Sequence, residues 1–157
     1  MNIFVLSLCP LLCAKMHCDK HVVKMITEYG QLLSTCHHVM NSSPSNDLFK
    51  KCFVNHPCSV WLRESVSNYI WLYNLFFHLC KEYTYRYSKI HKTDQRLRHL
   101  LNEIPDMLPD GTMTIFKLAM PNDVKCKNPV LAYHSYYRKN KRHIASWSKR
   151  KIPHFYY

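Results

Sequence analysis

Apolar side chains recur at helical spacing through residues 10 to 40. Val22, Ile26, Tyr29 and Leu33 follow one another at steps of four, three and four, which places them on one face of a helix. The pattern therefore predicts one long amphipathic helix over 10–40. Its other face carries a polar stripe made of His17, Lys20, His21, Lys24, Glu28 and Gln31. Such a stripe is either a functional site or an ordinary solvated face.

The rest of the chain predicts further helices joined by short loops. Asn55-His56-Pro57 offers a capping residue followed by proline, so we expect a second long helix from there to Tyr87. Residues 2–8 predict either a short strand or an extended, buried lead-in. Shorter helices are expected over 93–103, 114–120 and 129–148. Together these elements predict a mainly α, single-domain bundle of about five helices with a short extended N-terminal segment.

The charge of the chain indicates the chemistry of its partner. The 22 Lys and Arg residues against 10 Asp and Glu residues give a formal net charge of +12. Such an excess usually has a polyanionic partner, most often nucleic acid. Residues 124–157 carry nine Lys or Arg residues and no acid, interleaved with aromatic residues such as Tyr136 and Trp147. Cations can contact phosphates and flat rings can stack on bases, so this basic C-terminal region is a candidate nucleic-acid surface, with a core helix solvated on its outer side as the alternative.

Metal, membrane and secretion functions receive little support from the sequence. Cys9, Cys13, His17 and His21 are spaced four apart and could hold zinc on one helical face, but Pro10 interrupts the first pair and no CxxC motif occurs. The eight cysteines are irregularly spaced within apolar runs, as is typical of free thiols in a reducing compartment. No apolar stretch is long enough to span a membrane. We expect no metal, no cofactor and no membrane, and a location in the cytoplasm or nucleus.

The reactive groups that remain are amines. With two glycines in the chain, a phosphate-cradling loop is nearly excluded, and no GxSxG motif is present. A lysine near His21, another lysine and an apolar wall would keep more of its amine neutral and nucleophilic. Lys24 fits this description, and Glu28, one helical turn further, could transfer protons. The alternative is an ordinary surface pair of Lys24 with Glu28.

Several of these motifs together resemble a known family. The order of Lys20, Lys24, Glu28 and Gln31, followed by Asn55-His56-Pro57 with Trp61, is similar to the bacterial and viral proteins grouped as pyrimidine-dimer DNA glycosylases. The end of the second helix, Glu82–Tyr87, fits the same pattern. The C-terminal segments Pro121-Asn122-Asp123, Ala132-Tyr133 and His143-Ile144-Ala145, with Tyr137 and Trp147, resemble the last helix of the endonuclease V type more faintly.

The resemblance implies an all-helical enzyme that flips a nucleotide out of duplex DNA and attacks the sugar C1′ with its N-terminal amine. The resulting imine leads to base release and to strand cleavage, the lyase step. Carried over to this chain, the amine is that of Met1, or of Asn2 after removal of the methionine. The assisting carboxylate is Glu28 by the bacterial pattern, and Asp19 is a possible match to the endonuclease V type.

We therefore expect a DNA glycosylase with AP-lyase activity acting on double-stranded DNA, with no obligatory protein partner. The expected catalytic residues are Met1, Asn2, Lys24 and Glu28. The expected DNA-binding residues are His17, Lys20, His21, Gln31, Asn55, His56, Trp61, Arg86, Lys141, Arg142, Trp147, Lys149 and Arg150. The alternatives are a non-catalytic nucleic-acid-binding protein on the same scaffold and, less well supported, a small zinc-bound regulator.

Overall fold

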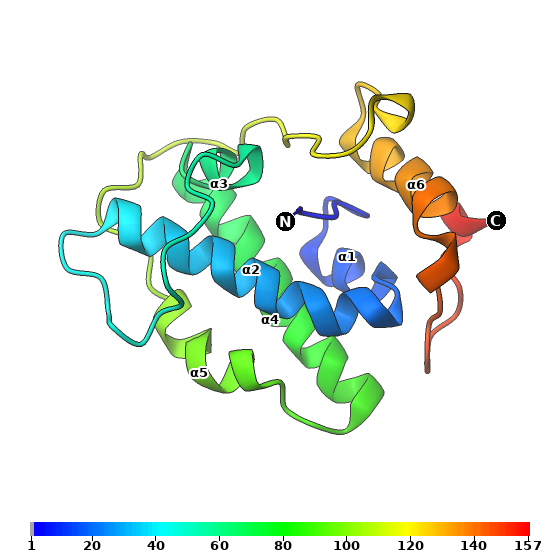
Figure 1. Ribbon diagram of the computed structural model, residues 1–157, viewed down its shortest axis with the longest axis horizontal. Coiled ribbons are helices and arrows are strands. Elements are labelled where there is room, and N and C mark those ends of the chain that lie inside the picture. The colour runs from blue at the N-terminus through cyan, green and yellow to red at the C-terminus, as the bar shows by residue number, and fades with distance from the viewer. Residues whose placement is uncertain (1) are drawn as a thin grey trace.

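The computed structural model describes residues 2–157, and this range is built from helices with no β-strand (Figure 1). The α-helices are α1 (Pro10–Met16), α2 (Asp19–Met40), α3 (Pro57–Leu62), α4 (Val66–Tyr87), α5 (Lys92–Leu101) and α6 (Pro129–Asn140). Short 3₁₀ turns lie at Asn122–Val124, Arg142–Ile144 and His154–Tyr156. The mainly α class predicted from the sequence is confirmed, and α5 agrees with its predicted range to within two residues.

The helix predicted over 10–40 is wrong in one respect, because it is broken into α1 and α2. The backbone of His17 and of Cys18 is extended between them, with ψ of 133° and 161°. The His17 ring turns into the core, where its Nδ1 donates to the Cys13 carbonyl at 2.7 Å and its Nε2 accepts from the Tyr29 hydroxyl at 2.9 Å. These two buried bonds stabilise the break, which the apolar spacing alone does not reveal.

The second predicted helix is also two helices, α3 and α4, separated by a sharp turn. Ser65 has an extended backbone, and its hydroxyl accepts from the amide of Asn68, so it caps the start of α4. The amide of Val66 donates to the carbonyl of Pro109, at 2.9 Å. A hydroxyl cap in the middle of an apolar pattern thus ends one helix and starts the next.

Residues 114–120 form no helix, contrary to the prediction. The amide of Thr114 donates to Asn68 Oδ1 at 2.9 Å, and its carbonyl accepts from Trp61 Nε1 at 3.3 Å. Phe116 stacks on the Trp61 ring with 4.8 Å between centroids. Side chains of α3 and α4 therefore take the backbone groups that a helix would have used internally.

Two long helices, α2 and α4, cross at the centre of the molecule, and α5 packs against both (Figure 1). Gly30 on α2 allows this close approach. A Cβ at this position would lie 2.9 Å from Thr93 Cγ2 and 3.2 Å from Leu97 Cδ1, both on α5. Any side chain at residue 30 would therefore push α5 away from α2.

The N-terminal segment is the extended, buried lead-in that was one of the two predicted alternatives. Ile3, Phe4, Val5 and Leu6 belong to the hydrophobic core. Phe4 donates its amide to the Tyr29 hydroxyl on α2, at 3.2 Å. Figure 1 shows this segment running between α2 and α6, with α1 beneath it.

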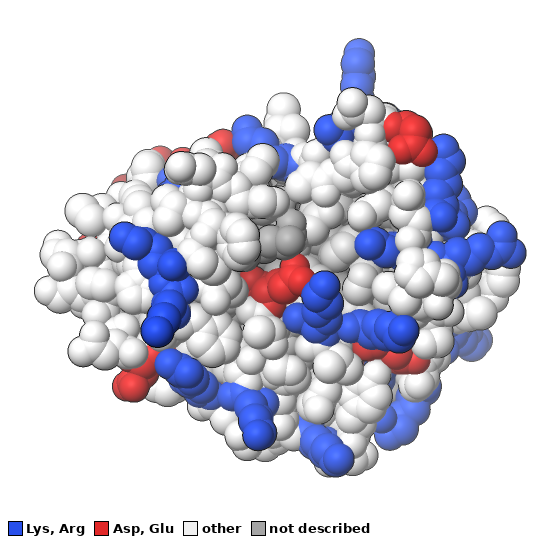
Figure 2. All heavy atoms as spheres, in the orientation of Figure 1, with Lys and Arg blue, Asp and Glu red and all other residues white. Residues whose placement is uncertain are grey.

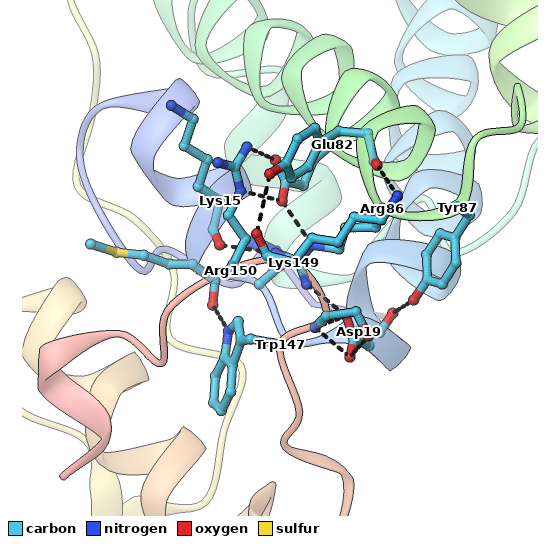
Figure 3. Close-up of polar contacts among 12 residues, drawn as sticks. Lys15, Asp19, Glu82, Arg86, Tyr87, Trp147, Lys149 and Arg150 are labelled. Carbon is cyan, nitrogen blue, oxygen red and sulfur yellow. Dashed lines mark hydrogen bonds and ion pairs between the residues drawn. The ribbon is translucent and has the colours of Figure 1, made fainter.

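The last predicted helix, over 129–148, ends early, at Asn140. The chain then folds back, and residues 146–150 dock at the junction of α1 and α2 (Figure 3). The Asp19 amide donates to the Ser146 carbonyl at 2.8 Å, and Trp147 Nε1 donates to the Met16 carbonyl at 2.9 Å. These contacts with α1 and α2 replace the helical hydrogen bonds that the prediction assumed.

Candidate active site

The amphipathic pattern of α2 brings Lys24 and Glu28 to one surface. Lys24 Nζ lies 3.3 Å from Glu28 Oε1, as expected for residues one turn apart. The Lys24 side chain is 71% exposed, whereas that of Glu28 is only 20% exposed. The apolar wall expected around the Lys24 amine is therefore not formed, and the carboxylate is the more enclosed member of the pair.

His56 lies close to this carboxylate from the start of α3. Its Nδ1 accepts from the amide of Cys58 at 3.2 Å, which caps α3 and fixes the ring. A neutral ring then carries its hydrogen on Nε2. Partial burial lowers the pKa of His56, and the nearby carboxylate of Glu28 acts in the opposite direction. The ring is thus a neutral hydrogen-bond donor at physiological pH, next to an acid.

The start of the described chain is fixed in the same region by Asn2. This side chain is only 8% exposed, its Nδ2 donates to the carbonyl of Ala119 at 2.8 Å, and its Oδ1 accepts from the Tyr133 hydroxyl at 2.7 Å. The backbone of the next residue, Ile3, contacts the thiol of Cys58, which lies two residues after His56. Asn2 is therefore held at the base of α3. Met1, the other expected source of the amine, lies outside the described residues.

A stack of rings connects this segment to the end of α6. Phe4 stacks on His21 at 4.2 Å and on Tyr136 at 6.0 Å, and Lys141 Nζ lies 4.9 Å above the Tyr136 ring. The charges of Lys141 and Lys24 both act on His21. Cations from α2 and from the end of α6 are thus brought near one another, although they are far apart in the sequence.

Figure 2 shows how these parts meet at the surface. The face is hollowed above the middle of α2, between the part built by α3 with its preceding loop and the part built by α6 with the C-terminal segment. Acidic atoms lie at the hollow, and Lys and Arg side chains lie on both sides of it. A carboxylate surrounded by cations in a concave surface is suited to bind a phosphate-bearing substrate and to transfer a proton.

Two members of the polar stripe, His17 and His21, are buried instead of facing this hollow. Burial lowers the pKa of His17 to about 4 and that of His21 to about 3. Each ring pairs with a tyrosine: His21 Nδ1 lies 2.5 Å from Tyr137 Oη, and His17 Nε2 lies 2.9 Å from Tyr29 Oη. Both rings are therefore neutral core groups in this structure, whereas DNA contact had been expected of them.

Other residues expected at the DNA surface are used to dock the C-terminal segment (Figure 3). Arg86 is buried, donating to Glu82 Oε1 at 2.7 Å and to Asp19 Oδ1 at 2.9 Å. Arg150 donates to both Glu82 oxygens, at 2.9 and 2.8 Å. Lys149 Nζ donates to the Tyr85 carbonyl at 3.1 Å. Trp147 is buried against α1, so none of these four groups is presented to the hollow.

Asp19, the alternative carboxylate, belongs to the same docking network. Its two oxygens accept from Arg86, from the Ser146 hydroxyl and from the amide and hydroxyl of Ser148. Burial works against the charge, but these hydrogen bonds hold the pKa of Asp19 below its usual range. Asp19 is thus committed to docking the C-terminal segment, whereas Glu28 shares the surface of α2 with Lys24.

The remaining expected residues divide into exposed groups and structural groups. Trp61, a residue of α3, is buried and stacks on Phe116. Gln31 donates to the carbonyl of Lys50 at 2.7 Å and so fixes the loop before α3. The surface residues are Lys20, Asn55 and Arg142, with Lys141 half-buried. The role of Asn2 in fixing the chain start was missed, because its partner Tyr133 is 131 residues away in the sequence.

The cysteines and histidines that are spaced four apart in the sequence do not come together as a metal site in the described residues. No group of three His, Cys, Asp or Glu side chains within 2–157 is arranged to hold a metal ion. Cys13 is instead buried beside the Phe4 carbonyl, and burial raises the pKa of its thiol to about 12. Within the same residues, no helix has the length and apolar character needed to cross a bilayer.

Comparison with known proteins gives the same family as the sequence motifs. A family model described as pyrimidine dimer DNA glycosylase matches residues 1–96. The match includes the N-terminal segment, α2 with Lys24 and Glu28, and α3 with His56. Neither the curated proteins nor the solved structures gave a match. Because the family model covers more than half of the 157 residues, the chain belongs to the pyrimidine dimer DNA glycosylase family.

Proposed function

We propose that this protein excises damaged pyrimidines through an amine and then cleaves the DNA strand, as a glycosylase with AP-lyase activity. Family membership implies a DNA glycosylase for pyrimidine dimers and DNA as the substrate. The observation that supports the finer mechanism is that Glu28 lies near His56, while Ile3 at the fixed start of the chain lies near Cys58, on the helix that His56 caps. These groups supply an acid–base pair beside a chain terminus.

The proposed reaction starts with a neutral amine. Its nitrogen attacks C1′ of the damaged nucleotide, and the bond from C1′ to the base breaks with its electron pair leaving on the base, which takes up a proton. The sugar ring opens as its oxygen takes a proton, and the nitrogen forms a protonated imine with C1′. Loss of a proton from C2′ then expels the 3′ phosphate, and water finally releases the amine. Glu28 is suited to give the proton to the ring oxygen and to remove the proton from C2′.

The amine we propose is the α-amine of Met1, or that of Asn2 after removal of the methionine. An α-amine has a reference pKa of about 8 against about 10.4 for a lysine, so far more of it is neutral near pH 7. Lys24 also lacks the apolar wall that was expected around its amine, since its side chain is 71% exposed. Lys24 is instead proposed to pair with Glu28 and to meet a phosphate.

The DNA is proposed to be double-stranded and to present the lesion as a flipped nucleotide. An intact stack would keep C1′ away from a carboxylate that is only 20% exposed in a hollow. The exposed cations beside the hollow, Lys20 and Lys24 on α2 and Arg142 after α6, offset the cost of flipping through phosphate contacts. His56 and Asn55 are proposed to donate hydrogen bonds to the sugar-phosphate backbone beside the lesion.

Trapping with borohydride tests the mechanism. Borohydride delivers a hydride to the imine carbon and makes the link to abasic-site DNA permanent, so wild-type protein should become covalently attached. Mass spectrometry of the linked peptide should identify the first residue and not Lys24. Glu28→Gln should slow strand cleavage by at least about 100-fold, because a proton-transfer group is lost. Glu103→Gln, a change of the same kind at an exposed residue after α5, serves as the control.

The outcomes separate the two functions considered from the sequence. Absence of trapping by wild-type protein that still binds DNA would leave a non-catalytic binder on this scaffold. Normal cleavage by Glu28→Gln would remove Glu28 from the mechanism while keeping the amine.

A further inference from the structure

Phe53 is an unusual residue in the loop before α3. Its side chain is 65% exposed, although aromatic side chains gain most from burial. Its backbone is left-handed, with φ of 50°, a conformation that is costly for a bulky residue without a compensating role. The loop therefore keeps a large apolar ring in water at a position where glycine would be easier to accommodate.

The backbone on both sides of Phe53 is firmly held. Thr35 Oγ1 donates to the Cys52 carbonyl at 3.1 Å and accepts from the Cys52 amide at 3.3 Å. Arg63 Nη2 donates to the Val54 carbonyl at 2.9 Å, and the His56 amide donates to the Phe53 carbonyl at 3.0 Å. The ring thus projects from a rigid support, so little conformational entropy is lost when it meets a partner.

The surroundings of the ring match nucleic acid. Lys50 and Lys51 precede it and are exposed, and Asn55 and His56 of the candidate site follow within three residues. Figure 2 shows basic side chains over this loop as well as over α2, on the face that contains the hollow. An exposed flat ring that lies in the sequence between Lys50 and Lys51 on one side and Asn55 and His56 on the other is suited to contact bases flanked by a phosphate backbone.

We propose that Phe53 inserts into the base stack of duplex DNA next to the flipped nucleotide. Inserted apolar side chains kink a duplex and take over stacking that the departing base had supplied. Since phenylalanine has no hydrogen-bonding group, the contact recognises a disrupted stack rather than a particular sequence. This inference rests on the proposed function, because it requires a lesion drawn into the hollow beside Glu28.

Substitutions at Phe53 test the insertion by comparing duplex and single-stranded substrates. Phe53→Ala should lower the single-turnover rate on duplex DNA by about 10-fold or more, since one base–aromatic stack is lost. The rate on the same lesion in a single strand should change by less than about twofold, because no paired stack has to be opened. Phe53→Trp should retain the duplex rate. Ile90→Ala, which removes a side chain of similar exposure (57%) between α4 and α5, is the control.

Phe53→Gly separates function from folding. Glycine relieves the left-handed backbone, so the Tm should stay unchanged or rise by about 2–4 °C while the duplex rate falls as in Phe53→Ala. Equal loss on duplex and single-stranded DNA, or no loss on either, would overturn the insertion.

A direct optical readout keeps the insertion testable even if catalysis fails. Wild-type protein should increase the fluorescence of 2-aminopurine placed beside an abasic site in duplex DNA, and Phe53→Ala should not. If wild-type protein gives no borohydride trapping but the fluorescence difference persists, the proposed chemistry fails and the insertion stands. An unchanged fluorescence response in Phe53→Ala would remove the insertion alone.

Discussion

Two groups of charged side chains on α2 and its neighbours behave in opposite ways. At the start of α2, Asp19 joins Glu82, Arg86 and Arg150 in a network where each carboxylate has fixed partners (Figure 3). Further along the same helix, Glu28 is 20% exposed and pairs with Lys24, which is 71% exposed. The same residue types therefore hold the molecule together at one end of the helix and are placed for chemistry near its middle. The exposure of the paired cation, 0% for Arg86 and 71% for Lys24, rather than charge itself, distinguishes the two groups.

The largest expected effect comes from breaking the docking network. Arg86→Met leaves Glu82 and Asp19 without their shared cation in a buried setting, so the free energy of unfolding should fall by about 3–5 kcal/mol. Lys24→Met, the matched change at the open site, should cost less than about 0.5 kcal/mol. Urea denaturation of both variants measures the difference. A similar loss of unfolding free energy in the two variants would show that the buried network and the Lys24–Glu28 pair contribute equally to stability.

A smaller effect is expected from acid, through three buried histidines, two on α2 and one just before it. Burial lowers the pKa of His17 to about 4, of His21 to about 3 and of His37 to about 4. The unfolded chain binds these protons near pH 6.5 and the native protein does not, so stability should be full above pH 6.5 and fall towards pH 4. Between pH 7.5 and 5.5 the expected loss is roughly 1 kcal/mol per histidine.

Denaturant titrations across this pH range test the expectation. His37→Gln should flatten the pH dependence, because one of the three groups no longer titrates. His99→Gln, at an exposed position on α5, should leave the dependence as in wild type. The opposite sign, with stability rising as the pH falls, would mean that the rings gain protons on folding.

The smallest effect is expected in the salt dependence of DNA binding, where only the open site should contribute. Lys20→Ala with Lys24→Ala should lower the slope of log K against log salt by about 2, since each phosphate contact contributes about 0.9. Lys89→Ala with Lys92→Ala should leave the slope unchanged. Both lysines are exposed, the first in the turn after α4 and the second at the start of α5. An equal reduction in both pairs would point to a diffuse surface instead of the rim of the hollow.

The sequence predicts the apolar face of α2 well, because Val22, Ile26, Tyr29 and Leu33 are all buried as their spacing requires. It does not predict the breaks at His17 and Ser65. Each break depends on side-chain hydrogen bonds that leave no periodic signal, one to a tyrosine and one to a backbone amide.

The candidate site was predictable only where its residues are close in sequence. Lys24 and Glu28 share a face by helical spacing, whereas their relation to His56 needs the tertiary fold. The pairing of Asn2 with Tyr133 and of Glu82 with Arg150 joins distant segments. Basic charge also misled the prediction, since a cation such as Arg86 can neutralise a buried acid as readily as it can meet a phosphate.

The docking of residues 146–150 ties the region matched by the family model to the rest of the chain. The region matched by the family model ends at residue 96, yet two of its acids, Asp19 and Glu82, take partners from beyond it. A fragment that ends at residue 96 would keep Arg86 between the two carboxylates, but Glu82 would lose Arg150 and Asp19 would lose both serines. The part of the chain after residue 96 therefore completes the polar contacts of the part that the family model matches.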